Sequence, residues 1–302
     1  MTTTRRYSTD QLRPYIDWTY FLHAWQMPPK YASAAALHQC PACREAWLAA
    51  ADNRSEAQEA LKLIDDALDM LHQLEAQAEV RGRVGLFGAN SRGDDILVTD
   101  DEGRVTLIPC LRQQVVAQGQ PNRCMADYVR PLETGVPDRI GVFATTVNFD
   151  PAAAFGGDAY NTMLAQTLCD RLAEAAACLL HLEVRREIWG YAPDEDLSVD
   201  DLLHEHNRGI RPAVGYPSLP DQSLNFVLNG LIRMDELGIA LTENGAMRPH
   251  ATVTGLMIAY AEASYFAVGP IDNEQLEDYA ARRGLPLDRA RQFLAANLNA
   301  MR

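Results

Sequence analysis

The sequence predicts an α+β domain with a mainly antiparallel sheet. Helical periodicity and β-rich runs come in separate blocks, without the regular strand and helix alternation that is typical of a parallel sheet. The 302 residues, 47% of them apolar, are enough for a substantial core. No stretch has the composition of a linker, so we expect one domain over residues 1–302.

Charge and composition exclude several function classes. The net charge is −14, which argues against sequence-independent nucleic-acid binding and against an anionic membrane surface. No apolar run is long enough to span a membrane, and the N-terminus lacks the apolar region of a secretory signal. We therefore expect a cytoplasmic protein that binds neither nucleic acid nor membrane, with its six cysteines as free thiols.

The first half of the chain predicts helix followed by strands. Residues 33–79 have helical periodicity, and their apolar positions predict one core-facing helix side formed by Leu61, Ile64, Leu68, Leu71 and Leu74. From Arg81 to Phe149, β-branched runs and tight turns predict strands. Gly85 and Gly88 in "GLFGAN" lack the third glycine of a dinucleotide-binding motif and indicate a strand end.

The second half predicts helices around one irregular loop. A helix of some thirty residues ends at Gly190, and Ser198 begins a short one. The stretch "RPAVGYPSLPDQ" (211–222) contains too many prolines for a helix or a central strand. A helix over 224–237, two β-rich runs within 251–271 and a final pair of helices complete the chain.

One cysteine motif allows three interpretations. His38, Cys40 and Cys43 in "HQCPACREAW" are residue types that bind zinc, and a CxxC pair also serves in redox chemistry. A closed zinc site needs four ligands, and the chain has no second CxxC. The third interpretation is a local helix start. No other familiar catalytic motif is present, and no catalytic residue is predicted.

Seven sequence blocks together carry a family resemblance. In chain order they are "YIDWTYFLHAW", "GLFGANSRGDDI", "LRQQ", "DRLAEAAACLLHLEVRREIWGYAPDEDLS", "GIRPAVGYPSLPDQ", "LTENGAM" and "SYFAV". The chain resembles the activation domain of cobalamin-dependent methionine synthase from about Tyr15 to Asn297. The resemblance implies a twisted, mainly antiparallel sheet with flanking helices.

The same resemblance implies a function. Activation domains of this family bind S-adenosylmethionine and support reductive remethylation of cob(II)alamin to methylcobalamin. The implied partners are the cobalamin-binding modules of methionine synthase and flavodoxin or a similar reductase. The chain carries none of the other synthase modules, so we expect it to be a component of a methyltransferase that does not catalyse the reaction alone.

The resemblance also implies eight residues that bind S-adenosylmethionine. They are Asp17, Glu174, Glu205, Arg211, Ala213, Tyr216, Tyr265 and Phe266. Arginine suits the ligand carboxylate, and the acids suit its ammonium and sulfonium groups. From the residues alone, other roles stay open: a surface ion pair for Arg211, a helix N-cap for Asp17, solvated helix faces for both glutamates, and core strand positions for the last two aromatic residues.

Two departures from the family pattern are visible. A helical insertion at about 30–60 contains the CxxC motif, and Cys110 occupies a position where histidine is expected. One hypothesis is that both tune the face that meets a cobalamin-carrying partner. The leading hypothesis is a free-standing activation subunit. The alternatives are a protein that binds or senses S-adenosylmethionine without cobalamin chemistry, and a zinc or thiol protein that uses the CxxC.

Overall fold

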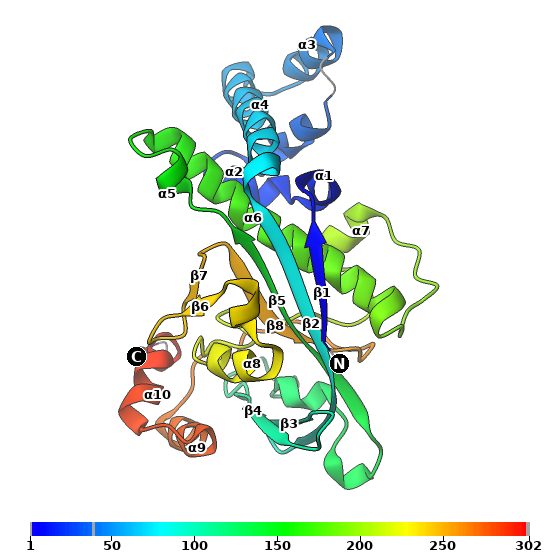
Figure 1. The fold of residues 1–302 in the computed structure, drawn as a ribbon, viewed down its shortest axis with the longest axis vertical. Coiled ribbons are helices and arrows are strands. Elements are labelled where there is room, and N and C mark those ends of the chain that lie inside the picture. Colours follow the sequence, from blue (N-terminus) through cyan, green and yellow to red (C-terminus); the bar gives the residue numbers. More distant parts are fainter. Residues whose placement is uncertain (1, 38–39, 300–302) are drawn as a thin grey trace.

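A six-stranded antiparallel sheet forms the centre of the computed structural model, which describes residues 2–37 and 40–299. The strand order is β4-β3-β2-β5-β8, and β1 also pairs with β2 (Figure 1). The strands are β1 Thr2–Tyr7, β2 Glu79–Arg92, β3 Asp95–Thr99, β4 Val105–Pro109, β5 Asp138–Asn148 and β8 Thr252–Met257. A two-stranded sheet holds β6 Ala240–Leu241 and β7 Met247–Arg248. The predicted α+β class with an antiparallel sheet is confirmed.

Strand β2 is the longest and organises the sheet. It pairs with β5 along residues 79–89 on one side, and on the other side first with β1 and then with β3. The prediction of a strand end at Gly85 and Gly88 is wrong, because both lie inside β2. A Cβ atom at Gly85 would come within 2.6 Å of the Phe87 ring, so this glycine makes room for a neighbouring aromatic ring.

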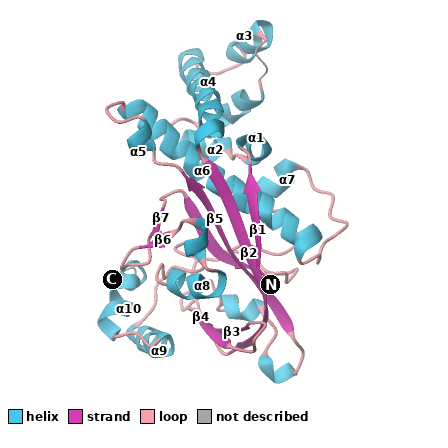
Figure 2. Ribbon diagram, in the orientation of Figure 1, coloured by secondary structure: helices cyan, strands magenta, loops and turns pink. Residues whose placement is uncertain are grey.

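Helices cover both faces of the sheet (Figure 2). They are α1 Thr9–Leu12, α2 Trp18–Ala24, α3 Pro41–Ala49, α4 Arg54–Gln77, α5 Pro151–Ala154, α6 Ala159–Glu183, α7 Val199–Leu203, α8 Leu224–Ile232, α9 Asn273–Arg283, α10 Leu287–Phe293 and α11 Ala295–Asn299. Helices α4 and α6 share one apolar core with Val84 and Phe143 of the sheet. Helix α8 packs on the opposite face with Val142 and Leu256.

Two helix predictions hold and two need correction. Helix α6 continues through a π-helical turn, Val184–Ile188, toward Gly190, and Ser198 caps α7 as predicted. The single helix over 33–79 is instead a 3-10 segment followed by α3 and α4, because Asn53 accepts a hydrogen bond from the Glu56 N–H and begins a new helix. The helix over 224–237 breaks at Arg233, whose φ is +52°.

The second β-rich run of the C-terminal region is not a strand. Residues 259–272 form a loop between β8 and α9, so the strand position expected for Tyr265 and Phe266 is wrong. The predicted core side of α4 is confirmed, since Ile64, Leu71 and Leu74 are buried.

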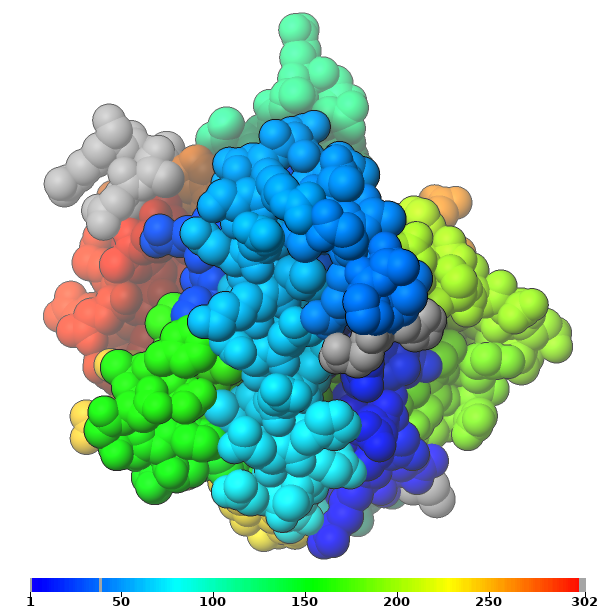
Figure 3. Space-filling view, turned by 90° about the horizontal axis from the view of Figure 1, so that it is seen from above, coloured from blue at the N-terminus to red at the C-terminus, as the bar shows by residue number. Residues whose placement is uncertain are grey.

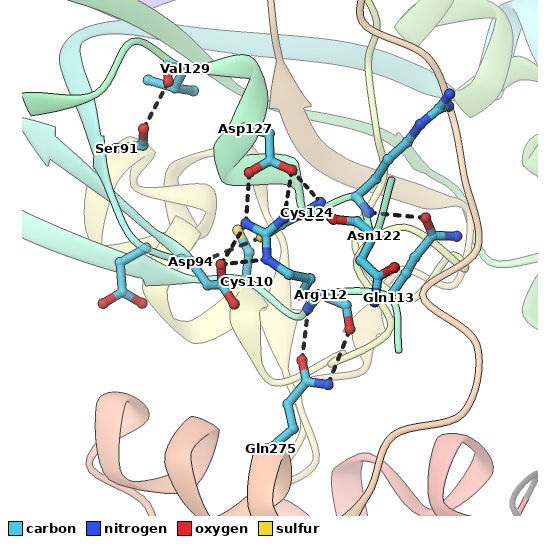
Figure 4. A network of polar contacts seen from close by, with 12 residues as sticks. Ser91, Asp94, Cys110, Arg112, Gln113, Asn122, Cys124, Asp127, Val129 and Gln275 are labelled. Atoms are coloured by element: carbon cyan, nitrogen blue, oxygen red, sulfur yellow. Dashed lines mark hydrogen bonds and ion pairs between the residues drawn. The ribbon is translucent and has the colours of Figure 1, made fainter. Parts of the chain in front are cut away.

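An ion-pair network joins the end of the sheet to the C-terminal helices (Figure 4). The Arg112 guanidinium bonds to Asp94 at 2.6 Å and to Asp127 at 2.7 Å, while Gln275 of α9 bonds to the Arg112 backbone. Cys110 lies beside this network and is 1% exposed. The hypothesis that Cys110 tunes a partner-facing surface is therefore wrong, because its side chain does not reach the surface.

The segment 210–214 extends the sheet beyond β8. Its backbone exchanges hydrogen bonds with Ile258, accepts one from Leu256 and donates one to Thr254, at 2.9 to 3.0 Å. Pro212 has no N–H to donate to the Leu256 carbonyl opposite it, so one bond of this short ladder is missing. The close approach requires Gly255, since a Cβ there would collide with the Pro212 carbonyl and come within 2.8 Å of the Ala213 Cα.

We expect Gly255→Ala to destabilise the fold by about 1–3 kcal/mol, the usual cost of overpacking, and to displace the 210–214 segment. Chemical denaturation measures the free energy of unfolding. Gly230→Ala is the matched control, because Gly230 lies in α8 with no atom within 4 Å of its Cβ position. That change should stabilise the helix by about 0.5–1 kcal/mol. Equal stability of both variants would contradict this role of Gly255.

Candidate functional site

Two adjoining cavities lie where α2, α6 and the 210–218 segment meet. Their volumes are about 460 Å³ and about 380 Å³, and their linings share Tyr20, Glu174, Glu205, Arg211 and Tyr216. The structure brings all eight predicted residues to these cavities. Of the predicted residues, the larger is lined by Glu174, Glu205, Arg211, Ala213, Tyr216, Tyr265 and Phe266, and the smaller by Asp17, Glu174, Glu205, Arg211 and Tyr216.

Arg211 supplies a positive charge to both cavities. Its backbone N–H donates to the Tyr265 hydroxyl at 2.9 Å. Within the described part of the chain, no hydrogen bond or ion pair engages its partly buried guanidinium, which differs from the surface ion pair left open by the sequence. Burial acts to lower the Arg211 pKa, but Cys178, Tyr265 and the carboxylates of Glu205 and Glu174 outweigh it and raise the pKa. The guanidinium is a charged group available to a ligand anion.

Three acidic residues from different elements line the cavities with Arg211. Glu174 lies on α6 and accepts a hydrogen bond of 3.0 Å from the Tyr216 hydroxyl. Asp17 caps α2, as its N-cap interpretation requires, and still lines the smaller cavity. Glu205 does not lie on a helix as expected. It follows the end of α7 with a φ of +58°, which turns the chain toward Arg211.

Aromatic side chains form the walls. Tyr216 is 53% exposed and Tyr265 is 38% exposed, so both present ring surface to the open cavity. The negative charge of Glu174 and burial raise the pKa of Tyr216 to about 12, and burial raises the pKa of Tyr265 to about 12. Both phenols therefore stay protonated at neutral pH and can donate hydrogen bonds. Phe266 contributes an apolar wall only.

The sequence matches one protein family over most of its length. The family model for the vitamin B12 dependent methionine synthase activation domain matches residues 8–284. The chain belongs to this family. A solved structure described as the MetH reactivation domain bound to AdoHcy is 38% identical, with a TM-score of 0.86 over 99% of this chain and 90% of that chain. The family resemblance and the fold predicted from it are confirmed.

The "LRQQ" block of this activation domain fastens the loop that carries the two aromatic walls. Beyond the Arg112 contact with α9, the Gln113 amide donates to the Ala267 carbonyl at 2.8 Å. Gln114 accepts from the Asp272 N–H at 2.7 Å, just before α9. Ser218 adds a tie between the two loops by donating to the Phe266 carbonyl at 2.5 Å. These contacts hold Tyr265 and Phe266 opposite Arg211 without a strand.

Tyr20 and Arg171 are among the lining residues that the sequence did not predict. Tyr20 lines both cavities of the activation domain and is 64% exposed, and the guanidinium of Arg171 lies 5.9 Å from its ring centre. Tyr20 could have been predicted from the sequence, because it lies in the first turn of the helix that the predicted ligand residue Asp17 caps. Arg171 lies on α6 one turn before Glu174 and lines the smaller cavity.

The cysteine motif belongs to a helix start. Cys40 caps α3, which confirms the local interpretation. His38 lies outside the described residues. Among the residues that the structure describes, no group of three or more His, Cys, Asp or Glu side chains is placed to hold a metal ion.

In the same described ranges, no helix is both long enough and apolar enough to cross a membrane.

His181 of the activation domain is buried on α6, one turn after Cys178, which lines the smaller cavity. Its imidazole is 0% exposed, and Nε2 lies 3.1 Å from the Tyr191 hydroxyl. Burial and, after it, the charges of Arg211 and Arg185 lower its pKa well below the ordinary value. The folded protein therefore keeps His181 neutral where the unfolded chain already binds a proton. This contribution to stability is present above the unfolded pKa of about 6.5 and is lost as the pH falls below it.

We expect the free energy of unfolding of the wild type to fall between pH 7 and pH 5 by about 2 kcal/mol more than that of His181→Gln, since each pH unit below 6.5 costs up to about 1.4 kcal/mol. Denaturant titrations at several pH values measure this difference. His72→Gln, which changes an exposed imidazole, is the control and should follow the wild type. Parallel curves for the wild type and His181→Gln would contradict the assignment.

Proposed function

We propose that the domain binds S-adenosylmethionine in the two adjoining cavities and supports reductive remethylation of cob(II)alamin on the cobalamin-binding modules of a methionine synthase. The single observation that carries the proposal is the free guanidinium of Arg211 among carboxylates and aromatic walls. The family match and the AdoHcy complex of the similar reactivation domain support it.

The donor set fits this ligand. S-adenosylmethionine has a carboxylate, which Arg211 would pair through two parallel N–H bonds. Its ammonium and sulfonium groups carry positive charge that Asp17, Glu174 and Glu205 would face. Its adenosine needs apolar and aromatic surface, which the larger cavity offers through Phe143, Val253 and the loop aromatics. A net positive ligand thus meets three acids and one base among the eight predicted residues.

Each protein group has a binding role in this proposal. The 210–214 segment is held on β8, so Arg211 and the main chain at Ala213 are ordered before the ligand arrives. The protonated phenols of Tyr216 and Tyr265 would orient polar ligand atoms. Bound S-adenosylmethionine supplies a methyl group activated by the sulfonium charge. The electron for the cobalamin would come from flavodoxin or a similar reductase, which completes the proposed set of partners.

Calorimetry of the purified chain with S-adenosylmethionine tests the binding step. We expect a measurable binding heat, and Arg211→Ala should weaken binding by at least about 1.5 kcal/mol, the scale of a lost hydrogen bond to a charged group. Arg92→Ala, which changes an exposed arginine at the end of β2, is the matched control and should bind as the wild type does. Absence of binding heat in the intact protein would overturn the proposal.

A further inference from the structure

Cys40 and Cys43 meet in the first turn of α3. Cys40 is the N-cap residue and Cys43 is the third residue of the helix. Side chains at these two positions face each other, as they do in a capping box. The Cys40 sulfur accepts a hydrogen bond from the Cys43 backbone N–H at 3.4 Å. This bond places the Cys40 sulfur against the backbone of Cys43 within one helical turn.

This turn is open to solvent while the rest of α3 is fixed. Pro41, Ala42 and Cys43 are exposed, and Cys40 is partly buried. From the next residue onward the helix is anchored, because Arg44 forms a two-bond ion pair with Asp65 of α4 at 2.5 and 2.8 Å. Figure 3 shows the segment that includes α3 and α4 on the outer surface of the molecule, where a reagent or partner can reach it.

The other four cysteines provide a contrast within the chain. Cys110, Cys124, Cys169 and Cys178 are all at least 96% buried. Burial raises the pKa of Cys169 to about 12 and also raises that of Cys178. The hydrogen bonds from the Cys43 thiol and then its N–H lower the pKa of the exposed-turn Cys40. Because the thiolate is the reactive form, Cys40 is the nucleophile of the pair.

We propose that Cys40 and Cys43 form a reversible disulfide by exchange with a small disulfide of the glutathione class. The Cys40 thiolate attacks one sulfur of that disulfide, forms a mixed disulfide and releases one thiolate, which takes up a proton. Cys43 then loses its proton and attacks the Cys40 sulfur. The Cys40–Cys43 bond forms, the second small thiolate leaves, and the two electrons of the dithiol have passed to the small disulfide.

The pair is separate from the ligand cavities. Residues lining the two cavities come from other elements, and none belongs to α3. Oxidation of this turn therefore tests a property of the chain that does not depend on binding of S-adenosylmethionine. It also differs from a zinc site, because the described residues place no third ligand beside the two sulfur atoms.

Incubation of the full chain with glutathione disulfide, followed by alkylation and mass spectrometry, tests the proposal. The tryptic peptide 31–44 contains both cysteines and no other. We expect it to lose two hydrogens while the four buried cysteines are alkylated only after denaturation, and reduced glutathione in excess should reverse the change. In the native protein, alkylation of Cys40 should be at least about tenfold faster than that of the buried thiols.

Two serine variants distinguish the steps. Cys43→Ser should stop at a mixed disulfide between glutathione and Cys40, whereas Cys40→Ser should react more slowly than Cys43→Ser. The proposal is overturned if the wild type also stops at the mixed disulfide, or if peptide 31–44 stays reduced under conditions in which Cys43→Ser takes up glutathione. Stoichiometric zinc that protects the pair in freshly purified protein, and that a chelator must remove before any reaction, would overturn it as well.

Discussion

The site depends on the backbone pairing between the 210–214 segment and strand β8. This pairing adds one more extended segment to the edge of the sheet, and it exists because Gly255 leaves room for the Pro212 carbonyl and for Ala213. Since alternate residues of the segment bond to β8, Arg211 and Ala213 direct their own backbone groups away from it. The most irregular stretch of the sequence is thus fixed by the most regular part of the fold.

The cavity wall formed by Tyr265 and Phe266 is held by side-chain hydrogen bonds and not by strand pairing. The loop with Tyr265 and Phe266 has no strand partner, and Gln113 and Ser218 hold its carbonyl groups in place. The Arg211 N–H to Tyr265 hydroxyl bond then joins this wall to the 210–214 segment. In a chain of net charge −14, the two cavities place the Arg211 guanidinium among Asp17, Glu174 and Glu205, and Arg171 also lines the smaller cavity. Charges of both signs in one site suit a ligand that carries charges of both signs.

Sequence patterns predicted the elements whose signal is local. The period of α4, the Ser198 cap and the α+β class all follow from near neighbours in the chain. Three features were not predicted from the sequence, because contacts between residues distant in the chain determine them. Strand β1 is three threonines, two arginines and a tyrosine, with little apolar signal. Gly85 continues a strand to accommodate Phe87, and the 265–266 aromatics lie in a loop held by "LRQQ". The eight site residues came from the family resemblance. Residue patterns alone left six of the eight with a structural explanation, because the residues lie on five separate segments that only the fold brings together.

The most direct test of the proposed remethylation follows the methyl group of S-adenosylmethionine. Methionine synthase from the same organism, with its cobalamin in the cob(II)alamin form and without an activation domain of its own, is mixed with a reductant and methyl-labelled S-adenosylmethionine. The account predicts that labelled methylcobalamin forms when this chain is added, that it does not form without the chain, and that Arg211→Ala slows its formation. Labelled methylcobalamin that appears at the same rate with and without the chain would contradict the account.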